Sequence, residues 1–238
     1  MLIKNFVLDF KCFTEFSEIC QSNDADSRIV SFCNPVTVEI LRNRPLLYDQ
    51  VDYWFSDGVL MTFLSGVVYG HHVRRCSFDF TSVAGLVMEY AILGEHKVGF
   101  IGGSEDEIEA FKLNIGKRYP QLNVGLAEHG FHCRDQWSDL LHKVQASGIN
   151  VLIVGLGCPL QEEFAVFIKS EIQQGMSIFT CGGFITQTSL AIDYYPLWVR
   201  HTGLRWLYRA IMHKHVRRRL LFTYPNFILR LLRERLSL

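Results

Sequence analysis

Four short segments of the chain carry residue types that bind or transform small polar molecules. They are residues 31–35, 55–58, 102–104 and 155–163, and each lies at the end of an apolar run. Open parallel sheets bind their ligands at the carboxyl ends of the strands, so loops of this kind are the expected position of a site. The chemistry available in them is that of carboxylates, carboxamides and glycine-rich backbone.

Asp57 and Asn34 are the residues of the first two segments whose side chains could take part in catalysis or binding. Asp57 precedes Gly58 after an aromatic run. A catalytic carboxylate and a simple Asp-Gly turn both explain this dipeptide. Asn34 precedes Pro35, and capping of a following helix is sufficient to explain it. The residues alone leave the turn and the catalytic interpretations of Asp57 open.

The other two segments are rich in glycine. Residues 102–104, Gly-Gly-Ser, would let a phosphate approach the backbone at a helix N-terminus, where N–H donors and the helix dipole favour anions. A tight strand-to-helix turn explains the same residues, and the spacing lacks the G-x-G-x-x-G pattern of a dinucleotide site. In residues 155–163, Glu162 and Glu163 are ordinary acidic residues of a first helical turn, but Gln161 has no such explanation.

These segments are positioned by alternating strand and helix patterns. We expect strands at residues 98–103, 122–127, 150–155 and 177–181, and helices at 105–118, 135–145 and 160–173. This alternation predicts β-α-β units and a parallel sheet. In the first half we expect a strand at 28–33 and helices at 35–46 and 81–93, which join the same sheet. The predicted fold is α/β, a Rossmann-like parallel sheet flanked by helices.

A basic C-terminal appendage follows this sheet. The chain has 238 residues and a formal net charge of zero, but ten of its 24 Lys and Arg residues lie from residue 200 onward with a single acid, Glu234. The body therefore carries about −9 and the tail about +9, a split that points to an anionic partner. Apolar residues alternate with the arginines, so we expect basic amphipathic helices. We place the boundary between an α/β domain, residues 1–195, and the appendage, residues 196–238.

Composition narrows the class of protein. With 49% hydrophobic and 20% charged residues the chain can form a sizeable core, which excludes intrinsic disorder. The seven cysteines are odd in number and irregularly spaced, as is typical of buried thiols in a reducing compartment. The N-terminus has no secretory signal, and the longest charge-free stretch, residues 175–192, is too polar to span a membrane. We therefore expect a cytoplasmic protein whose membrane contact is peripheral.

Three other functions are disfavoured by the residues. His129, His132 and Cys133 lie close together but lack the spacing of a four-ligand zinc site, so no metal site is predicted. An NAD-linked enzyme would need the missing glycine fingerprint. The basic, aromatic tail suits single-stranded nucleic acid, but the acidic body would repel a polyanion, so we predict no nucleic-acid partner.

Taken in order, the loops resemble the WecG/TagA/CpsF family of bacterial glycosyltransferases. The resemblance is collinear over about four fifths of the chain. Its most specific blocks are Gly-x-Gly-x-Pro-x-Gln-Glu at residues 155–162 and Gly-Leu-x-Trp-Leu-Tyr-Arg at residues 203–209. The other matches are Asn34-Pro35, Asp57-Gly58, Arg74 with Asp79, residues 100–103, residues 118–120, Gly130-Phe131, residues 182–184 and residues 196–198.

The resemblance implies an inverting, metal-independent transfer of a sugar from a UDP-sugar to an undecaprenyl-pyrophosphate-linked saccharide, in bacterial exopolysaccharide or cell-surface polysaccharide synthesis. It implies that Asp57 is the general base, which removes the proton of the acceptor hydroxyl as that hydroxyl attacks from the face opposite UDP. It assigns the diphosphate to Arg74, whose guanidinium offers paired donors. The full substrate-binding set implied is Asn34, Arg74, Asp79, Gly102, Gly103, Gly130, Phe131, Gly157, Pro159, Gln161 and Glu162.

Four positions depart from the family pattern and bear on the donor sugar. Phe32 stands in place of a threonine, Ser77 in place of a glycine, and Thr186 and Arg205 in place of acids. The loss of several polar positions favours a neutral hexose such as glucose as the donor sugar, with an N-acetylhexosamine as the alternative.

The tail then acquires a predicted function at the inner face of the plasma membrane. Arg209, Arg217, Arg218 and Arg219 are expected to contact anionic headgroups or the lipid pyrophosphate. In the alternative, these helices pack on the body and the arginines pair with its surplus acids, and the two arrangements can coexist. A catalytically inactive family member that acts as a membrane-bound scaffold is the rival hypothesis, which holds only if Asp57 is dispensable.

Overall fold

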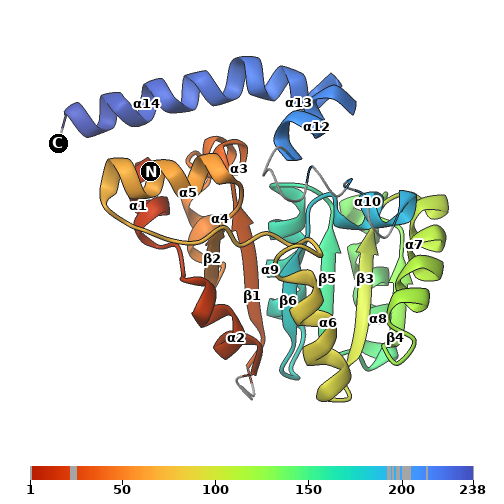
Figure 1. The fold of residues 1–238 in the computed structure, drawn as a ribbon. Coiled ribbons are helices and arrows are strands. Elements are labelled where there is room, and N and C mark those ends of the chain that lie inside the picture. The colour runs from red at the N-terminus through yellow and green to blue at the C-terminus, as the bar shows by residue number, and fades with distance from the viewer. Residues whose placement is uncertain are drawn as a thin grey trace.

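A single parallel sheet organises the part of the chain that the computed structural model describes, namely residues 2–21, 26–191, 194, 196, 199, 205–212 and 214–237. Its six strands are all parallel and lie in the order β2-β1-β6-β5-β3-β4 (Figure 1). Their bounds are β1 Arg28–Cys33, β2 Tyr53–Ser56, β3 Lys97–Gly102, β4 Asn123–Glu128, β5 Val151–Gly155 and β6 Ser177–Thr180. The predicted α/β fold, with both halves of the chain in one sheet, is confirmed.

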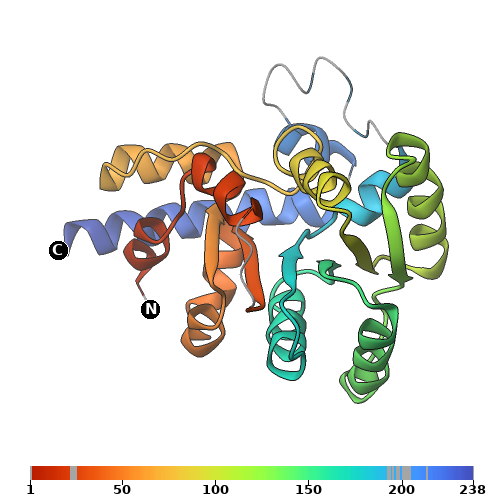
Figure 2. The same cartoon turned by 90° about the horizontal axis from the view of Figure 1, so that it is seen from below.

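Helices cover both faces of this sheet (Figure 2). The helices of the α/β part are α1 Ile3–Leu8, α2 Phe13–Gln21, α3 Pro35–Leu41, α4 Pro45–Asp49, α5 Val59–Tyr69, α6 Ala84–Leu93, α7 Glu105–Arg118, the short η1 Arg134–Gln136, α8 Trp137–Ser147, α9 Leu160–Glu171 and α10 Phe184–Leu190. The C-terminal part contains α12 Arg205–Met212, α13 Lys214–Arg218, the π-helical η2 Arg219–Thr223 and α14 Tyr224–Leu236.

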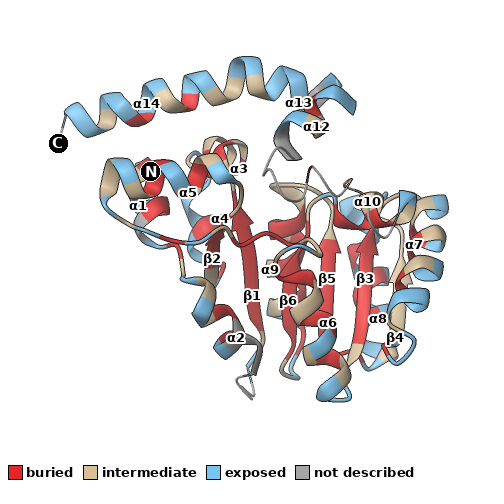
Figure 3. Cartoon of the chain, in the orientation of Figure 1, coloured by how far each residue is buried: buried red, intermediate tan, exposed pale blue. Residues whose placement is uncertain are grey.

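Two hydrophobic cores result from the alternation of side chains along the strands. Ile29 and Leu152 point into one core, with α1, α3, α5, α8, α9 and α14. Val30 and Val151, their neighbours in sequence, point into the other core, with α2, α6, α7 and α10. Because successive strand residues face opposite sides, a strand covered on both faces is apolar throughout, as the buried strands in Figure 3 show.

Helix boundaries follow the local signals in most places. Ser104 caps α7 in a capping box with Glu107, and Gly148 ends α8 in the left-handed conformation. The helix expected at residues 35–46 is instead two helices, α3 and α4, because Pro45 begins a new one. A proline inside a helix removes a backbone hydrogen bond and clashes with the preceding turn, so the break is where the sequence requires it.

The C-terminal helices lie across the end of the molecule at which the strands terminate (Figure 1). Phe227 and Leu231 of α14 are fully buried in the core that includes α1 and α3. Glu234 accepts a hydrogen bond from the backbone N–H of Ile3 at 2.7 Å, and Arg230 lies 3.3 Å from Glu39 of α3. The tail is therefore helical and docked on the body. Tyr195, where we place the domain boundary, lies outside the described residues, and the division at that point stays a prediction.

Candidate active site

We place the candidate site where the carboxyl ends of β2, β1 and β6 lie side by side, toward the middle of the sheet, and we call this position the crevice. Helix α3 follows β1 and leads toward β2, whereas α10 follows β6 and packs against α7. The chain therefore leaves two neighbouring strands in opposite directions, which is the topological switch point where open α/β sheets form their ligand crevice. Asn34 follows β1, Asp57 follows β2 and Gly182 follows β6, so these loops meet at this crevice.

Asp57 is held at the carboxyl end of β2 by three hydrogen bonds. Its backbone N–H donates to the carbonyl oxygen of Cys33 at 2.8 Å. Its carboxylate accepts a hydrogen bond from the Ser77 hydroxyl, and the Asn34 carboxamide lies 3.5 Å from its other oxygen. The residue remains partly exposed. A carboxylate in this setting is oriented by donors on one side and reachable by an acceptor hydroxyl on the other.

Asn34 does two things at once. Its side-chain oxygen accepts from the backbone N–H groups of Val36 and Thr37, at 3.0 and 3.2 Å, and so caps α3. Because the oxygen is occupied, its amide nitrogen is directed to Asp57. The capping interpretation of Asn34 is confirmed, and the cap also positions the donor that faces the candidate base.

Ser77 is a site residue that sequence reasoning noted only as a departure from the family glycine. Its hydroxyl donates to Asp57, and its backbone N–H donates to the Ser82 hydroxyl at 3.2 Å. The signal in the sequence was a small polar residue, Ser77, at a family glycine position close to the candidate residues Arg74 and Asp79. Its partner, 20 residues earlier in the chain, could not be inferred from spacing.

The two arginines after α5 have different environments. Arg75 forms an ion pair with Asp79, whose other carboxylate oxygen accepts from the Thr81 backbone N–H at 2.9 Å. Asp79 is therefore engaged by protein groups. Arg74 is exposed, and its guanidinium lies over the ring of Phe13 at 5.2 Å from the centroid. Of this pair, Arg74 is the cation that a diphosphate in solution can reach.

Gln161 and Glu162 lie beneath the crevice and not on its surface. Gln161 is 5% exposed and Glu162 is 0% exposed. The Gln161 amide donates to the Glu162 carboxyl at 2.8 Å, and its oxygen accepts from the backbone N–H of Gly182 at 3.1 Å. The same Glu162 oxygen accepts from the Ser31 hydroxyl at 2.9 Å. The pair thus connects strand β1 with the segments that follow β5 and β6, which is a supporting role for the crevice.

Burial raises the pKa of the Glu162 carboxyl, although the hydrogen bonds from Gln161 and Ser31 oppose the shift. The second Glu162 oxygen is buried without a hydrogen-bond partner among the described residues. Burial raises the pKa of the neighbouring Cys158 thiol as well, with the charge of Glu162 as the next cause. A neutral carboxyl is the form that such deep burial favours.

Replacement of Glu162 by Gln tests this assignment. A carboxyl with a raised pKa contributes fully to stability below its usual value of 4.5, and this contribution is lost as the pH rises through the raised pKa. A glutamine does not titrate. We therefore expect the free energy of unfolding of Glu162→Gln to rise relative to that of the native chain between about pH 5 and about pH 8, because only the native side chain titrates.

Urea unfolding at the two pH values measures this difference. Glu89→Gln, at an exposed position of α6, is the matched control and should show no such change. A stability difference for Glu162→Gln that does not vary with pH would mean that the carboxyl has an ordinary pKa.

The glycines of the predicted site fall into two groups. A Cβ on Gly102 would lie 2.7 Å from the carbonyl oxygen of Gly155, and one on Gly130 would lie 3.0 Å from the Cα of Gly102. These two glycines are needed for close packing of loops. Gly103 has its carbonyl bonded to Gly130 at 2.8 Å. Gly157 has a φ of +76°, and a Cβ there would meet nothing within 4 Å beyond its chain neighbours, so its backbone is open to a ligand.

The predicted site residues lie in a row along the carboxyl ends of the strands and do not form one cluster. Asp57 follows β2 and Gly157 follows β5. Phe131 follows Gly130, which packs on the last residue of β3. At about 4.8 Å per strand, the ends of β2 and β5 are roughly 14 Å apart, and those of β2 and β3 roughly 19 Å. Phe131 is 78% exposed. Pro159 lies between Gly157 and the start of α9 and is partly exposed.

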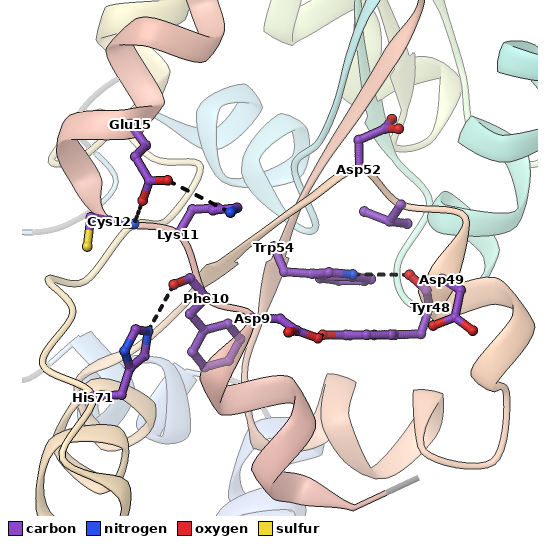
Figure 4. A pocket seen from close by; sticks show the side chains of 11 residues that line it. Asp9, Phe10, Lys11, Cys12, Glu15, Tyr48, Asp49, Asp52, Trp54 and His71 are labelled. Carbon is purple, nitrogen blue, oxygen red and sulfur yellow. Dashed lines mark hydrogen bonds and ion pairs between the residues drawn. The ribbon is translucent and has the colours of Figure 1, made fainter.

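A separate hollow of about 550 Å³ lies at the outer edge of β2 (Figure 4). Tyr48 stacks on Trp54 with ring centroids 5.1 Å apart, and its hydroxyl donates to Asp9 at 2.6 Å. Burial, followed by the hydrogen bond to Asp9, raises the pKa of Tyr48. His71 donates to the carbonyl oxygen of Phe10 at 3.0 Å. The hollow contains none of the residues predicted for the site.

Comparison with known proteins decides the family. Residues 6–238 match the model of the Glycosyl transferase WecG/TagA/CpsF family. The chain belongs to this family. The resemblance inferred from the motifs is confirmed.

Two curated relatives of this WecG/TagA/CpsF chain have names that state the acceptors on which those two proteins act. The UDP-Gal:alpha-D-GlcNAc-diphosphoundecaprenol beta-1,4-galactosyltransferase of Shigella boydii is 37% identical over 209 residues, which cover 87% of each chain. The N-acetylglucosaminyldiphosphoundecaprenol N-acetyl-beta-D-mannosaminyltransferase of Staphylococcus aureus strain MW2 is 23% identical over 171 residues, which cover 70% of this chain and 63% of the relative. Both relatives are glycosyltransferases that are named for lipid-diphosphate-linked acceptors.

The departures of this WecG/TagA/CpsF chain have identifiable structural roles. Phe32 packs among aromatic rings, 6.1 Å from Phe55 and 5.9 Å from Phe78 between centroids. Thr186 donates to Glu107 at 3.2 Å, in the capping box of α7. Phe32 therefore belongs to a core, and only Ser77 of the departures with described side chains contacts Asp57. The side chain of Arg205 lies outside the described part of the structure.

The tail arginines of this family member are placed unequally. Arg217 donates to the carbonyl oxygens of Ala210 and Ile211, at 3.1 and 2.8 Å, and so closes the end of α12. Arg218 and Arg219 are exposed and form no ion pair with another described residue. The side chain of Arg209 lies outside the described part.

The described residues show neither a cluster arranged for a metal ion nor a membrane-spanning helix. No group of three or more His, Cys, Asp or Glu side chains in the described ranges is arranged to hold a metal ion. His129 and His132 stack on each other with ring centroids 4.0 Å apart. Metal independence itself stays a prediction. None of the helices in those same ranges is both long and apolar enough to cross a membrane.

Proposed function

We propose that this chain transfers a neutral hexose from a UDP-hexose to an undecaprenyl-diphosphate-linked saccharide, with inversion at the anomeric carbon and with Asp57 as the general base. The observation that carries the proposal is the setting of Asp57. It is a partly exposed carboxylate at the crevice, oriented by Ser77 and Asn34, in a chain that is 37% identical to a galactosyltransferase with such an acceptor.

The reaction is a single displacement. The acceptor O–H bond breaks as its proton passes to the Asp57 carboxylate, and the oxygen forms a bond to the anomeric carbon. The bond from that carbon to the UDP oxygen breaks, and UDP leaves with the electron pair. Attack from the opposite face converts an α-linked UDP-hexose into a β-linked product. The β-1,4 linkage in the name of the Shigella boydii relative fits this outcome.

We assign binding of the UDP-sugar donor to the exposed groups along the carboxyl ends of the strands. Arg74 offers a guanidinium for the diphosphate, and Gly157 offers open backbone near the N-terminus of α9. Gln161 and Glu162 act from below, because they are buried and bond the segment after β6 through Gly182. Phe131 is exposed in the loop after β4 and is suited to an apolar or stacking contact.

Membrane association is proposed through the outer surface of the tail. With about 3.6 residues per turn, Leu229, Leu232 and Leu236 project from α14 opposite its buried residues Phe227 and Leu231. The three leucines are 53%, 46% and 88% exposed. Arginines flank them, so the helix has the pattern of one that lies in a membrane interface. We propose attachment to the cytoplasmic leaflet, where the lipid-linked acceptor would be met.

A panel of UDP-sugars tests the proposal. UDP release is followed with UDP-galactose, UDP-glucose, UDP-N-acetylglucosamine and UDP-N-acetylmannosamine, each with and without a short-chain polyprenyl-diphosphate-linked N-acetylglucosamine. We expect acceptor-dependent release from one neutral hexose donor, with galactose or glucose as the active sugar. Absence of release and of donor binding for all four would favour a membrane-bound scaffold without transferase chemistry.

A further inference from the structure

Helix α5 has an apolar face that the protein does not cover. Val59, Phe63 and Val67 are 54%, 60% and 67% exposed, and they recur every four residues. Met61 and Leu64 on the opposite side are buried in the core. The helix contains no charged residue on any side. A solvent-facing helix surface is normally polar, so a continuous apolar stripe of about 12 Å indicates a contact with something apolar.

The position of the stripe relates it to the candidate base. Gly58, with a φ of +89°, separates Asp57 from Val59, the first residue of α5. Asp57 is therefore two residues from the start of the stripe. A surface that contacts the start of the stripe therefore also lies close to the Asp57 carboxylate.

Helix α5 lies close to the helix whose outer surface we assign to the membrane. Helices α5 and α14 both pack against α1, and both lie at the end of the molecule where β1 and β2 terminate (Figure 1). Helices α5 and α14 thus flank the same small helix, α1. His72 and Arg74, both exposed, follow α5 directly and add cationic character to its C-terminal end.

We infer that α5 inserts its stripe, Val59, Phe63 and Val67, into the headgroup and acyl boundary of the lipid leaflet and sets Asp57 at headgroup level. This inference rests on the proposed function and deepens it. The tail supplies an electrostatic contact to anionic lipid together with the apolar contact of its outer leucines, and α5 adds a second apolar contact close to the base. A diphosphate at the lipid surface is then presented to the crevice without leaving the leaflet.

Vesicle sedimentation of the full-length protein tests the inference. The double change Phe63→Gln and Val67→Gln removes two apolar side chains from the stripe. The matched control is Leu93→Gln with Leu113→Gln, two apolar side chains that are 86% and 67% exposed on α6 and α7. The probe is vesicles of phosphatidylcholine with phosphatidylglycerol, at low and at high salt.

The α5 double variant is expected to bind these vesicles about tenfold more weakly or worse, and the control variant is expected to bind like the native chain. Salt screens charges but not apolar contacts. The binding that survives high salt is therefore apolar, and the α5 variant should lose part of it. Equal binding by the α5 variant and the native chain at both salt concentrations would overturn the inference.

A second measurement locates the side chain directly. Phe63→Trp should gain fluorescence that lipids brominated near the headgroup quench, whereas Leu93→Trp should not. If the α5 variants instead change the oligomeric state with no change in quenching, the occupant of the stripe is a second copy of the chain and the inference is wrong. Vesicle binding needs no turnover, so the two proposals fail separately. Absence of transfer with every donor would contradict the proposed function, whereas the contact between α5 and lipid is decided by the vesicle experiments alone.

Discussion

Replacement of Asp57 by Asn is expected to lower the rate of sugar transfer by roughly 10² to 10⁴ while UDP-sugar binding persists. Asparagine keeps the shape of the side chain but cannot accept the proton of the acceptor hydroxyl. The carboxamide can still meet Asn34 and Ser77, so the fold of the crevice should be preserved. Steady-state UDP release measures the rate, and calorimetry with the preferred UDP-sugar measures donor binding.

Asp106→Asn is the matched control for this change. Asp106 is an exposed acid in the first turn of α7 and loses the same charge at a distance from the crevice. We expect its transfer rate to equal that of the native chain. Unchanged transfer in Asp57→Asn would remove Asp57 from the mechanism. Loss of donor binding together with transfer would assign it to the donor site and not to proton removal.

Exchange of Arg217, Arg218 and Arg219 for Glu is expected to abolish sedimentation with anionic vesicles. Each basic residue near an anionic surface contributes about 1 kcal/mol, so loss of three corresponds to more than a hundredfold in affinity, and the added negative charge repels further. Sedimentation with vesicles that contain phosphatidylglycerol measures the effect. Vesicles of phosphatidylcholine alone give the uncharged reference.

The structure makes a sharper version of this experiment possible. Arg217 closes the end of α12, so its replacement alters the helix as well as the charge. The double variant Arg218→Glu with Arg219→Glu leaves that contact intact and should lose most of the same binding. If vesicle binding persists in the double variant but falls in the triple one, the arginines serve to pack the tail and not to bind lipid.

The sequence by itself determined the fold class and most of the elements that carry the site. The helix α7 and the strand β1 lie where the patterns predict them, because a capping box and a continuous apolar run are local signals. Collinear motifs were enough to place the chain in its family. They were also enough to nominate Asp57 and Asn34, which the fold brings to the same crevice.

Tertiary structure decided which of the nominated residues face a ligand. Glu162 and Gln161 share a motif with the exposed backbone of Gly157, yet they lie below the crevice, because α9 packs on β1, β5 and β6. Ser77 reaches Asp57, and Arg75 pairs with Asp79 so that its neighbour Arg74 is left at the surface.

The exposure of the apolar stripe of α5 is likewise decided by the tertiary structure. An apolar helix has the same sequence pattern whether a core, a membrane or nothing covers it. Burial and pairing are set by contacts between segments far apart in the chain, and these contacts depend on the order of strands in the sheet. Local patterns specify the elements, but the strand order specifies which faces of those elements remain open to solvent and substrate.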